Sequence, residues 1–138
     1  MDWEECVNYL LTTAQHHVHE RMSQLLAPYG ITPGQYGVLN CLWNKRGDTP
    51  KELAQTLNLE TSTVSGLLDK MQRRGVIDRI ISEADRRVVR IILTDEGCAL
   101  QEPVLAVIRQ VNSEVLSGFT SAESEALLAA LRAIIYRN

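Results

Sequence analysis

The sequence lacks the features that mark several large classes of protein. Its three cysteines, Cys6, Cys41 and Cys98, are an odd number with no close pair, which excludes a disulfide framework and a CxxC metal site. Reduced thiols in a cytoplasm fit this usage best. No apolar run is long enough for a signal peptide or a membrane span, so we expect a cytoplasmic protein without a membrane partner.

Catalytic and metal-binding motifs are also missing. The sequence holds no glycine-rich phosphate loop, no GxSxG and no HExxH, so we expect no enzyme activity and no cofactor. His16, His17 and His19 lie near Glu20 on one predicted helix, but zinc needs three or four convergent ligands and no distant partner set is visible. We therefore predict no metal site.

A strong excess of positive charge is absent from the chain as a whole, although one segment has it. A length of 138 residues predicts a single domain, 1–138, with a net charge of −3. Residues 61–93 contain seven Lys/Arg and four Asp/Glu, a local charge of +3, and the remaining residues carry −6. A local positive segment of this kind favours contact with nucleic acid.

Residues 49–75 have the pattern of two short helices joined by a tight turn. Thr49 can cap the first helix, Pro50 suits its first position, and Glu52 stands where a capping-box carboxylate belongs. Asn58 begins the break, and Gly75 is a natural stop for the second helix. The second helix has core positions at helical spacing, namely Val64, Leu67, Leu68 and Met71. The pattern predicts a helix-turn-helix.

The outer face of the second helix is small or hydroxylic and ends in positive charge. Small side chains allow close approach to another surface, hydroxyls can bond phosphates or base edges, and Lys/Arg supply charge. The DNA-contact candidates on this helix are Thr61, Ser62, Thr63, Ser65, Gly66, Lys70 and Arg73. Gln35 and Lys51, near the starts of two other helices, are further candidates for phosphate contacts.

A charged hairpin follows the two helices. Residues 79–81 and 88–93 are β-branched runs of strand length, and residues 82–87 between them are strongly charged. The tip carries Asp85, Arg86 and Arg87. A hairpin in this place is a wing, so the sequence predicts a mostly α fold with a small β-hairpin, a winged helix-turn-helix whose helix suits a major groove and whose wing suits the adjacent backbone or minor groove.

Several motifs in one order resemble the MarR family of bacterial transcriptional regulators. They are Gly75-Val76-Ile77-Asp78-Arg79, Asp85-Arg86-Arg87 and Ile91-Ile92-Leu93-Thr94-Asp95-Glu96-Gly97. Upstream, Ser62-Thr63-Val64-Ser65, Leu67-Leu68-Asp69-Lys70 and Thr32-Pro33-Gly34-Gln35-Tyr36-Gly37-Val38-Leu39 match as well. The resemblance covers essentially the whole chain. It implies that Arg87 reaches the minor groove, that Asp85 orients the wing, and that Arg86 contacts a phosphate.

Long amphipathic helices at both ends of the chain have more apolar face than a small winged helix can cover. One stripe runs from Trp3 to about Ala27, another follows Thr94 with Pro103 predicting a kink or break, and a third follows Thr120. We expect residues 1–30 and 95–138 to form dimerisation helices and residues 31–94 to form the DNA-binding part. A homodimer, which the resemblance also implies, would present two recognition helices to a near-palindromic operator on double-stranded DNA.

These expectations lead to a homodimeric, DNA-binding repressor that a small lipophilic or phenolic effector releases from DNA. Effector-binding candidates are His16, His17, Tyr36 and Trp43, which could line a cleft between the dimerisation helices and the winged part. Two alternatives remain open. One is a winged-helix protein-interaction module without DNA binding, against which Arg73, Arg86 and Arg87 argue. The other is a thiol-based redox-sensing repressor using Cys6, with Cys41 and Cys98 as buried packing residues.

Overall fold

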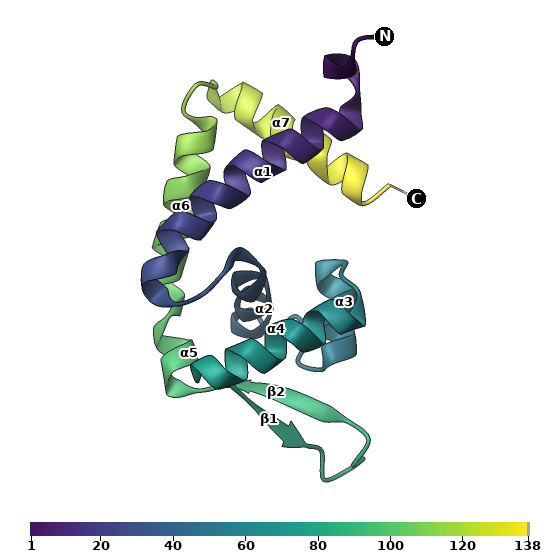
Figure 1. The fold of residues 1–138 in the computed structure, drawn as a ribbon, viewed down its shortest axis with the longest axis vertical. Helices are drawn as coiled ribbons and strands as arrows, with labels where there is room; N and C mark the ends of the chain where they lie inside the picture. The colour runs from purple at the N-terminus through teal and green to yellow at the C-terminus, as the bar shows by residue number, and fades with distance from the viewer. Residues whose placement is uncertain (138) are drawn as a thin grey trace.

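The computed structural model describes residues 1–137 as a mostly helical chain with one antiparallel hairpin, which confirms the predicted fold class. In chain order the elements are η1 (Trp3–Glu5), α1 (Val7–Leu26), η2 (Ala27–Tyr29), α2 (Pro33–Trp43), α3 (Pro50–Leu57), α4 (Thr61–Arg74), β1 (Ile77–Ile81), β2 (Val89–Leu93), α5 (Asp95–Ala99), α6 (Gln101–Leu116) and α7 (Ser121–Ile135). Figure 1 shows α1, α6 and α7 at one end with both termini, and α2–α4 with the hairpin at the other.

Threonine caps set the starts of several helices, as the sequence predicts. Thr32, Thr49 and Thr120 each accept a hydrogen bond from the backbone N–H three residues on, and the Gln or Glu at that position completes a capping box. Asn58, at φ 55°, ends α3 in the left-handed region, and Gly75, at φ 89°, ends α4 in the same way. The break between α3 and α4 and the stop after α4 are therefore confirmed.

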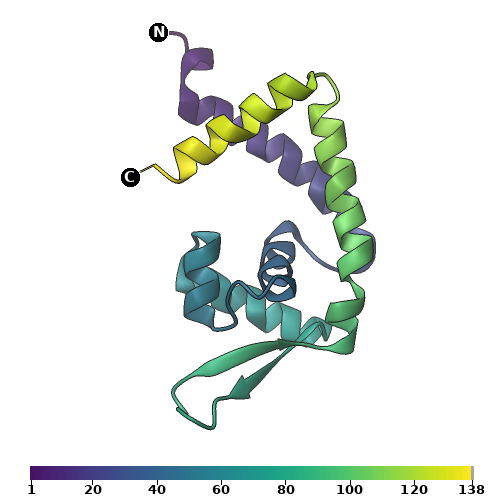
Figure 2. The same ribbon diagram turned by 180° about the vertical axis from the view of Figure 1, so that it is seen from behind.

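One core fills the winged half of the molecule and extends to Leu26 of α1 and to Val104, Val107 and Val111 of α6. Its fully buried members include Leu39, Leu53, Val64, Leu68, Met71, Val76 and Ile77. Strand β1 pairs with β2 so that Ile77 lies opposite Leu93 and Ile81 opposite Val89. The carbonyl of Asp48 accepts a hydrogen bond of 2.7 Å from the Ile91 N–H, so the loop before α3 pairs with the free edge of β2. Figure 2 shows the hairpin extending beyond the helices at the lower end.

The helices at the chain ends pack differently. Helices α1 and α6 lie against each other, and Arg21 joins them through a bidentate pair with Glu114, with Nε–Oε2 at 2.8 Å and Nη2–Oε1 at 2.9 Å. This hydrogen bonding holds the pKa of Glu114 at about 2 and raises that of Arg21. Within residues 1–137, α1 buries only Leu26 and α7 buries no residue. The apolar stripes of these two helices are left open.

The structure corrects the expected first helix and confirms that the helix after Thr94 is broken. The first helix is interrupted, because Cys6 is extended (ψ 118°) between η1 and α1. The helix after Thr94 breaks at Leu100, ahead of Pro103, into α5 and α6. On α5, Gly97 is buried, and Cys98 is exposed rather than buried as predicted. Gly97 is required there, because a Cβ would lie 2.1 Å from the Val76 carbonyl oxygen.

Candidate nucleic-acid interface

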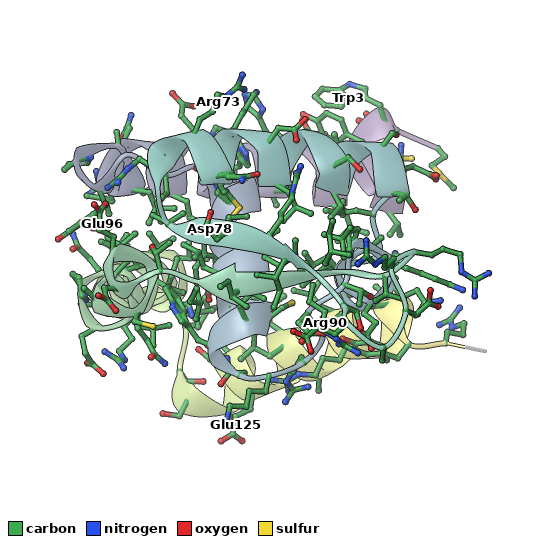
Figure 3. The ribbon with its side chains drawn as sticks, turned by 90° about the horizontal axis from the view of Figure 1, so that it is seen from below. Trp3, Arg73, Asp78, Arg90, Glu96 and Glu125 are labelled. Carbon is green, nitrogen blue, oxygen red and sulfur yellow. The ribbon has the colours of Figure 1, made fainter. Side chains whose placement is uncertain are left out.

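The predicted contact face of α4 is exposed along its whole length. Val64, Leu68 and Met71 point into the core and Leu67 is half-buried against it, which leaves the opposite side of the helix in solvent. The predicted contact residues all lie on that exposed side, namely Thr61, Ser62, Thr63, Ser65, Gly66, Lys70 and Arg73. Figure 3 looks onto this end of the molecule and shows Arg73 projecting from α4, with the strands between it and Arg90.

Gly66 lies in the interior of α4 without a structural reason inside the chain. A Cβ at this position would meet nothing within 4 Å, and its backbone has no left-handed φ. Glycine in a helix interior costs roughly 1 kcal/mol relative to alanine. Nothing in the described fold requires a glycine at this position.

The wing tip is organised around Asp85. Its carboxylate accepts hydrogen bonds from the Arg87 backbone N–H (3.1 Å), Nε (3.1 Å) and Nη2 (3.3 Å), and these bonds lower the pKa of Asp85. The Arg87 side chain is nonetheless 90% exposed. A guanidinium has five N–H donors, so Arg87 keeps free donors directed at solvent while Asp85 limits its rotation. Arg86 is exposed beside it.

Four of the seven basic residues in 61–93 have a carboxylate partner within the chain. Besides Arg87, these are Arg74, which pairs with Glu96 at 2.9 Å, Arg79, with Asp69 of α4 at 2.8 Å, and Arg90, with Asp48 at 2.6 Å. The last two connect the hairpin to the recognition helix and to the loop before α3. Within residues 1–137 the basic residues of this segment that form no ion pair are Lys70, Arg73 and Arg86. The local charge of +3 predicted from the sequence includes all seven of these residues, and the ion pairs of Arg74, Arg79 and Arg90 were not predicted.

Of the two further phosphate candidates, one is wrong. Gln35 is buried, with 6% exposed, and its side-chain oxygen accepts the Thr32 backbone N–H at 3.2 Å, so its amide completes a cap and is unavailable to DNA. The motif that suggested a phosphate contact is a capping box. Lys51 is exposed near the start of α3 and stays a prediction.

Two hollows accompany the terminal helices. A groove of about 640 Å³, almost wholly apolar, is lined by side chains of α1, α6 and α7, among them Leu11, Val18, Val115, Leu127 and Leu131. A second, of about 540 Å³, lies between the end of α3 and the end of α7, where Leu57 and Asn58 face Ile135 and Tyr136.

None of the four predicted effector residues lines either hollow. His16 and His17 are exposed on α1, whereas Tyr36 and Trp43 lie 6.5 Å apart in the winged half, where the Trp43 Nε1–H donates to the Gly97 carbonyl. His19 lines the apolar groove instead. Its spacing of four and eight residues from Gln15 and Leu11, on one face of α1, was the signal that could have identified it.

The cysteines are separate, with Cys6 exposed and Cys41 buried, and burial raises the pKa of the Cys41 thiol. No group of three or more His, Cys, Asp or Glu side chains in residues 1–137 is arranged to hold a metal ion. No helix in the same range combines the length and apolar character that a membrane span requires.

Comparison with known proteins agrees with this geometry. Residues 31–89 match the family model of the MarR family. The HTH-type transcriptional regulator YsmB of Bacillus subtilis (strain 168) is 32% identical over 77% of this chain and 73% of its own length. The organic hydroperoxide resistance transcriptional regulator of the same strain is also 32% identical, over 78% of this chain and 73% of its own.

Solved structures share the fold over nearly the whole chain. The S. aureus MepR–DNA complex has a TM-score of 0.86 at 26% identity and covers 94% of this chain and 96% of that one. Bordetella bronchiseptica BpsR, whose DNA binding is regulated by 6-hydroxynicotinic acid, has a TM-score of 0.89 at 24% identity and covers 100% and 99%. The winged fold, the family match and these relatives agree, and the chain belongs to the MarR family of transcriptional regulators.

Proposed function

We propose that this regulator is a homodimeric repressor that binds a near-palindromic operator through α4 and the wing and is released by a small effector. The observation that carries the proposal is the exposed face of α4, with Gly66 at its centre and no protein atom to explain it. Thr61, Ser62, Thr63 and Ser65 would meet base edges and phosphates, and Lys70, Arg73 and Arg86 would supply charge. Arg87, held by Asp85, would enter the minor groove.

The open apolar stripes of the terminal helices support a homodimer. In a single chain the groove between α1, α6 and α7 has almost no polar lining, and Leu128, Ile134 and Ile135 of α7 are 41%, 47% and 62% exposed. An exposed apolar surface of this extent marks an interaction site. A two-fold axis through these helices would place one α4 on each side of the axis, to match two half-sites of DNA.

The hollow between the ends of α3 and α7 supports effector control. A ligand there would touch the winged half through Leu57 and the terminal half through Ile135, so it would favour one relative orientation of the two halves. Its mixed polar and apolar lining suits a small lipophilic or phenolic molecule. By analogy with BpsR, which an aromatic acid regulates, ligand binding would change DNA affinity and leave the ligand chemically unaltered.

The experiment is selection of a duplex from a random-sequence pool by wild-type protein, followed by affinity measurement for Gly66→Ala. The added methyl meets no protein atom, so we expect Gly66→Ala to raise the melting temperature and to weaken binding of the selected duplex by about 1–3 kcal/mol, the range of a single specific contact. Gly118→Ala is the matched control, since its Cβ is equally unobstructed but far from α4. If wild type selects no duplex, the alternative of an interaction module without DNA binding is favoured; if it selects one and folded Gly66→Ala binds it with unchanged affinity, Gly66 is not at the contact face.

A redox-sensing repressor is a second candidate, which the exposure of Cys6 favours. Cys6 lies at the start of α1, and the similar regulator from Bacillus subtilis is named for organic hydroperoxide resistance. The test is treatment with cumene hydroperoxide: a redox sensor would lose its duplex in wild type and keep it in Cys6→Ser. Equal loss or equal retention in both proteins would exclude a role for Cys6.

A further inference from the structure

Arg74, the last residue of α4, bonds both terminal segments of the chain at once. Its Nη1 pairs with Glu96 Oε2 at 2.9 Å, and its Nη2 donates to the Tyr29 carbonyl at 3.0 Å. Glu96 is in α5, which leads into α6, and Tyr29 ends η2, which continues α1. Helix α4 therefore ends at a guanidinium that bonds η2, which follows α1, and α5, which precedes α6. Figure 1 shows α4 ending near α5, below the lower end of α1.

On the α1 side, this bond stands alone. Among residues 1–137, a single hydrogen bond joins residues 1–30 to residues 31–94, and it is the bond from Arg74 to Tyr29. Gly30 makes room for it: a Cβ there would lie 2.7 Å from Arg74 Nε, and its φ of +70° is a conformation that L side chains rarely adopt. Two separate features of Gly30 thus fit a guanidinium lying across its backbone.

On the α5 side, the ion pair adds to a junction that the backbone already makes. The Thr94 hydroxyl donates to the Gly75 carbonyl at 2.6 Å, and the Thr94 N–H donates to the Val76 carbonyl at 3.1 Å. The end of α4 is consequently held to α5 without Arg74, whereas its hydrogen-bonded link to α1 depends on Arg74. Loss of this side chain would remove the hydrogen-bonded link between α4 and the end of α1 and leave only apolar packing, including that of Leu26 in the shared core, to set their relative position.

We propose that Arg74 is a positioning residue that couples α4 to the terminal helices and so sets the distance between the two recognition helices of the dimer. The inference rests on the proposed function, because only a dimer on two half-sites needs such a distance. Arg74 would act through α4 and not as a DNA contact, because Glu96 and Tyr29 fix the position of its guanidinium through one donor on each terminal nitrogen. An arginine bonded to two rigid segments transmits a change in one of them to the other.

The test compares Arg74→Gln with Arg73→Gln, which removes the same charge from the adjacent, unpaired residue. The probe is the duplex selected by wild-type protein, together with versions whose half-sites are one base pair closer or farther apart. We expect Arg74→Gln to bind the selected duplex about tenfold more weakly, to lose its preference for that spacing, and to keep the slope of log affinity against log salt. Arg73→Gln should keep the spacing preference and show a slope shallower by about one per lost phosphate contact.

Glu96→Ala supplies the second variant and guards against a folding defect in Arg74→Gln. If Arg74 were a phosphate contact, removing its carboxylate partner would strengthen DNA binding. If Arg74 is a positioning residue whose guanidinium Glu96 holds against the Tyr29 carbonyl, Glu96→Ala should weaken spacing discrimination despite the lost negative charge. Arg74→Lys, which keeps the charge but cannot bridge both partners, should resemble Arg74→Gln in spacing. If wild type selects a duplex and folded Arg74→Gln or Glu96→Ala retains full spacing discrimination, this inference fails alone; if wild type selects no duplex, the proposed function fails with it.

Discussion

The winged half and the terminal half of this chain both have apolar helical stripes, but they differ in what they bury. Helices α2, α3 and α4 place their stripes into a shared core that includes Leu39, Leu53 and Leu68, each no more than 1% exposed. The stripe of α7 is just as regular, yet no residue of that helix is buried. The winged half buries its apolar stripes within one chain, whereas the terminal half leaves an apolar surface open, which the proposed dimer would cover.

The comparison separates two roles for the same kind of pattern. Helical periodicity predicts that one face of a helix is apolar, but it does not predict whether the surface that covers this face lies in the same chain. In the winged half, short connections bring the partners together. At the chain ends, α1 and α7 are distant in sequence, and the groove between α1, α6 and α7 leaves their faces open.

The largest effect is expected from a charge in the open stripe. Leu131→Glu would place a carboxylate in the proposed interface, where burial of an unpaired charge costs several kcal/mol, so the dimer and with it operator binding should be lost at micromolar concentration. Sedimentation measures the mass. Glu125→Gln is the control on the same helix, because Figure 3 shows Glu125 projecting away from the molecule. An unchanged dimer in Leu131→Glu would show that α7 is not at the interface.

A cavity in the winged core should have the next largest effect, on the free energy of unfolding. Leu39 is fully buried, and Leu39→Ala should lower the free energy of unfolding by about 2–5 kcal/mol, as core truncations of this size do. Ile80→Ala, on the solvent face of the wing at 46% exposure, should change it by less than about 0.5 kcal/mol. Urea unfolding at one protein concentration gives both values. Equal losses would mean that the wing face is covered in solution.

Arg87→Ala tests the wing as a DNA contact. We expect binding of the selected duplex to weaken by about 1–3 kcal/mol per protomer, with a salt slope shallower by about one per lost ionic contact. The dimer should persist, since the side chain is 90% exposed and remote from α7. Ser65→Ala, in contrast, should change sequence preference and leave the slope nearly unchanged. A folded Arg87→Ala with wild-type affinity and slope would remove the wing from the interface.

The smallest effect concerns acid stability of the terminal half. Arg21 lowers the pKa of Glu114 from 4.5 to about 2, so the stabilisation from this pair is complete above about pH 4.5 and is lost as the pH falls towards 2. Glu114→Gln should therefore unfold more readily than wild type at pH 6, and the difference should shrink by pH 3. Thermal unfolding followed by circular dichroism measures both. A difference that grows at low pH would contradict the assigned direction.

The sequence predicted most of the fold because its signals are local. The threonine caps, Gly75 and the β-branched runs each act within a few residues, and the structure has elements at all of them. The predictions that were wrong concern contacts between residues distant in sequence. Cys98 is exposed because the backbone around Gly97 meets Val76, and no periodicity reports such a contact.

The candidate site shows the same division. The exposed face of α4 follows from helical spacing alone, so all seven of its predicted residues lie on one side. The ion pairs Arg79–Asp69 and Arg90–Asp48 join positions ten and 42 residues apart, and only the fold shows that these two arginines have carboxylate partners. The four proposed effector residues do not form one site. Tyr36 and Trp43 lie in the winged half, whereas His16 and His17 are exposed on α1, and helical spacing within each segment does not reveal this separation.

Sedimentation velocity of the wild-type protein, alone and with the selected duplex, tests the division of roles most directly. The account predicts a species of twice the 15.5 kDa chain mass in the absence of DNA, and a complex of two chains on one duplex when DNA is added. A 15.5 kDa monomer that binds the duplex one chain at a time would contradict it, because α1 and α7 would then leave their apolar faces open without a second copy.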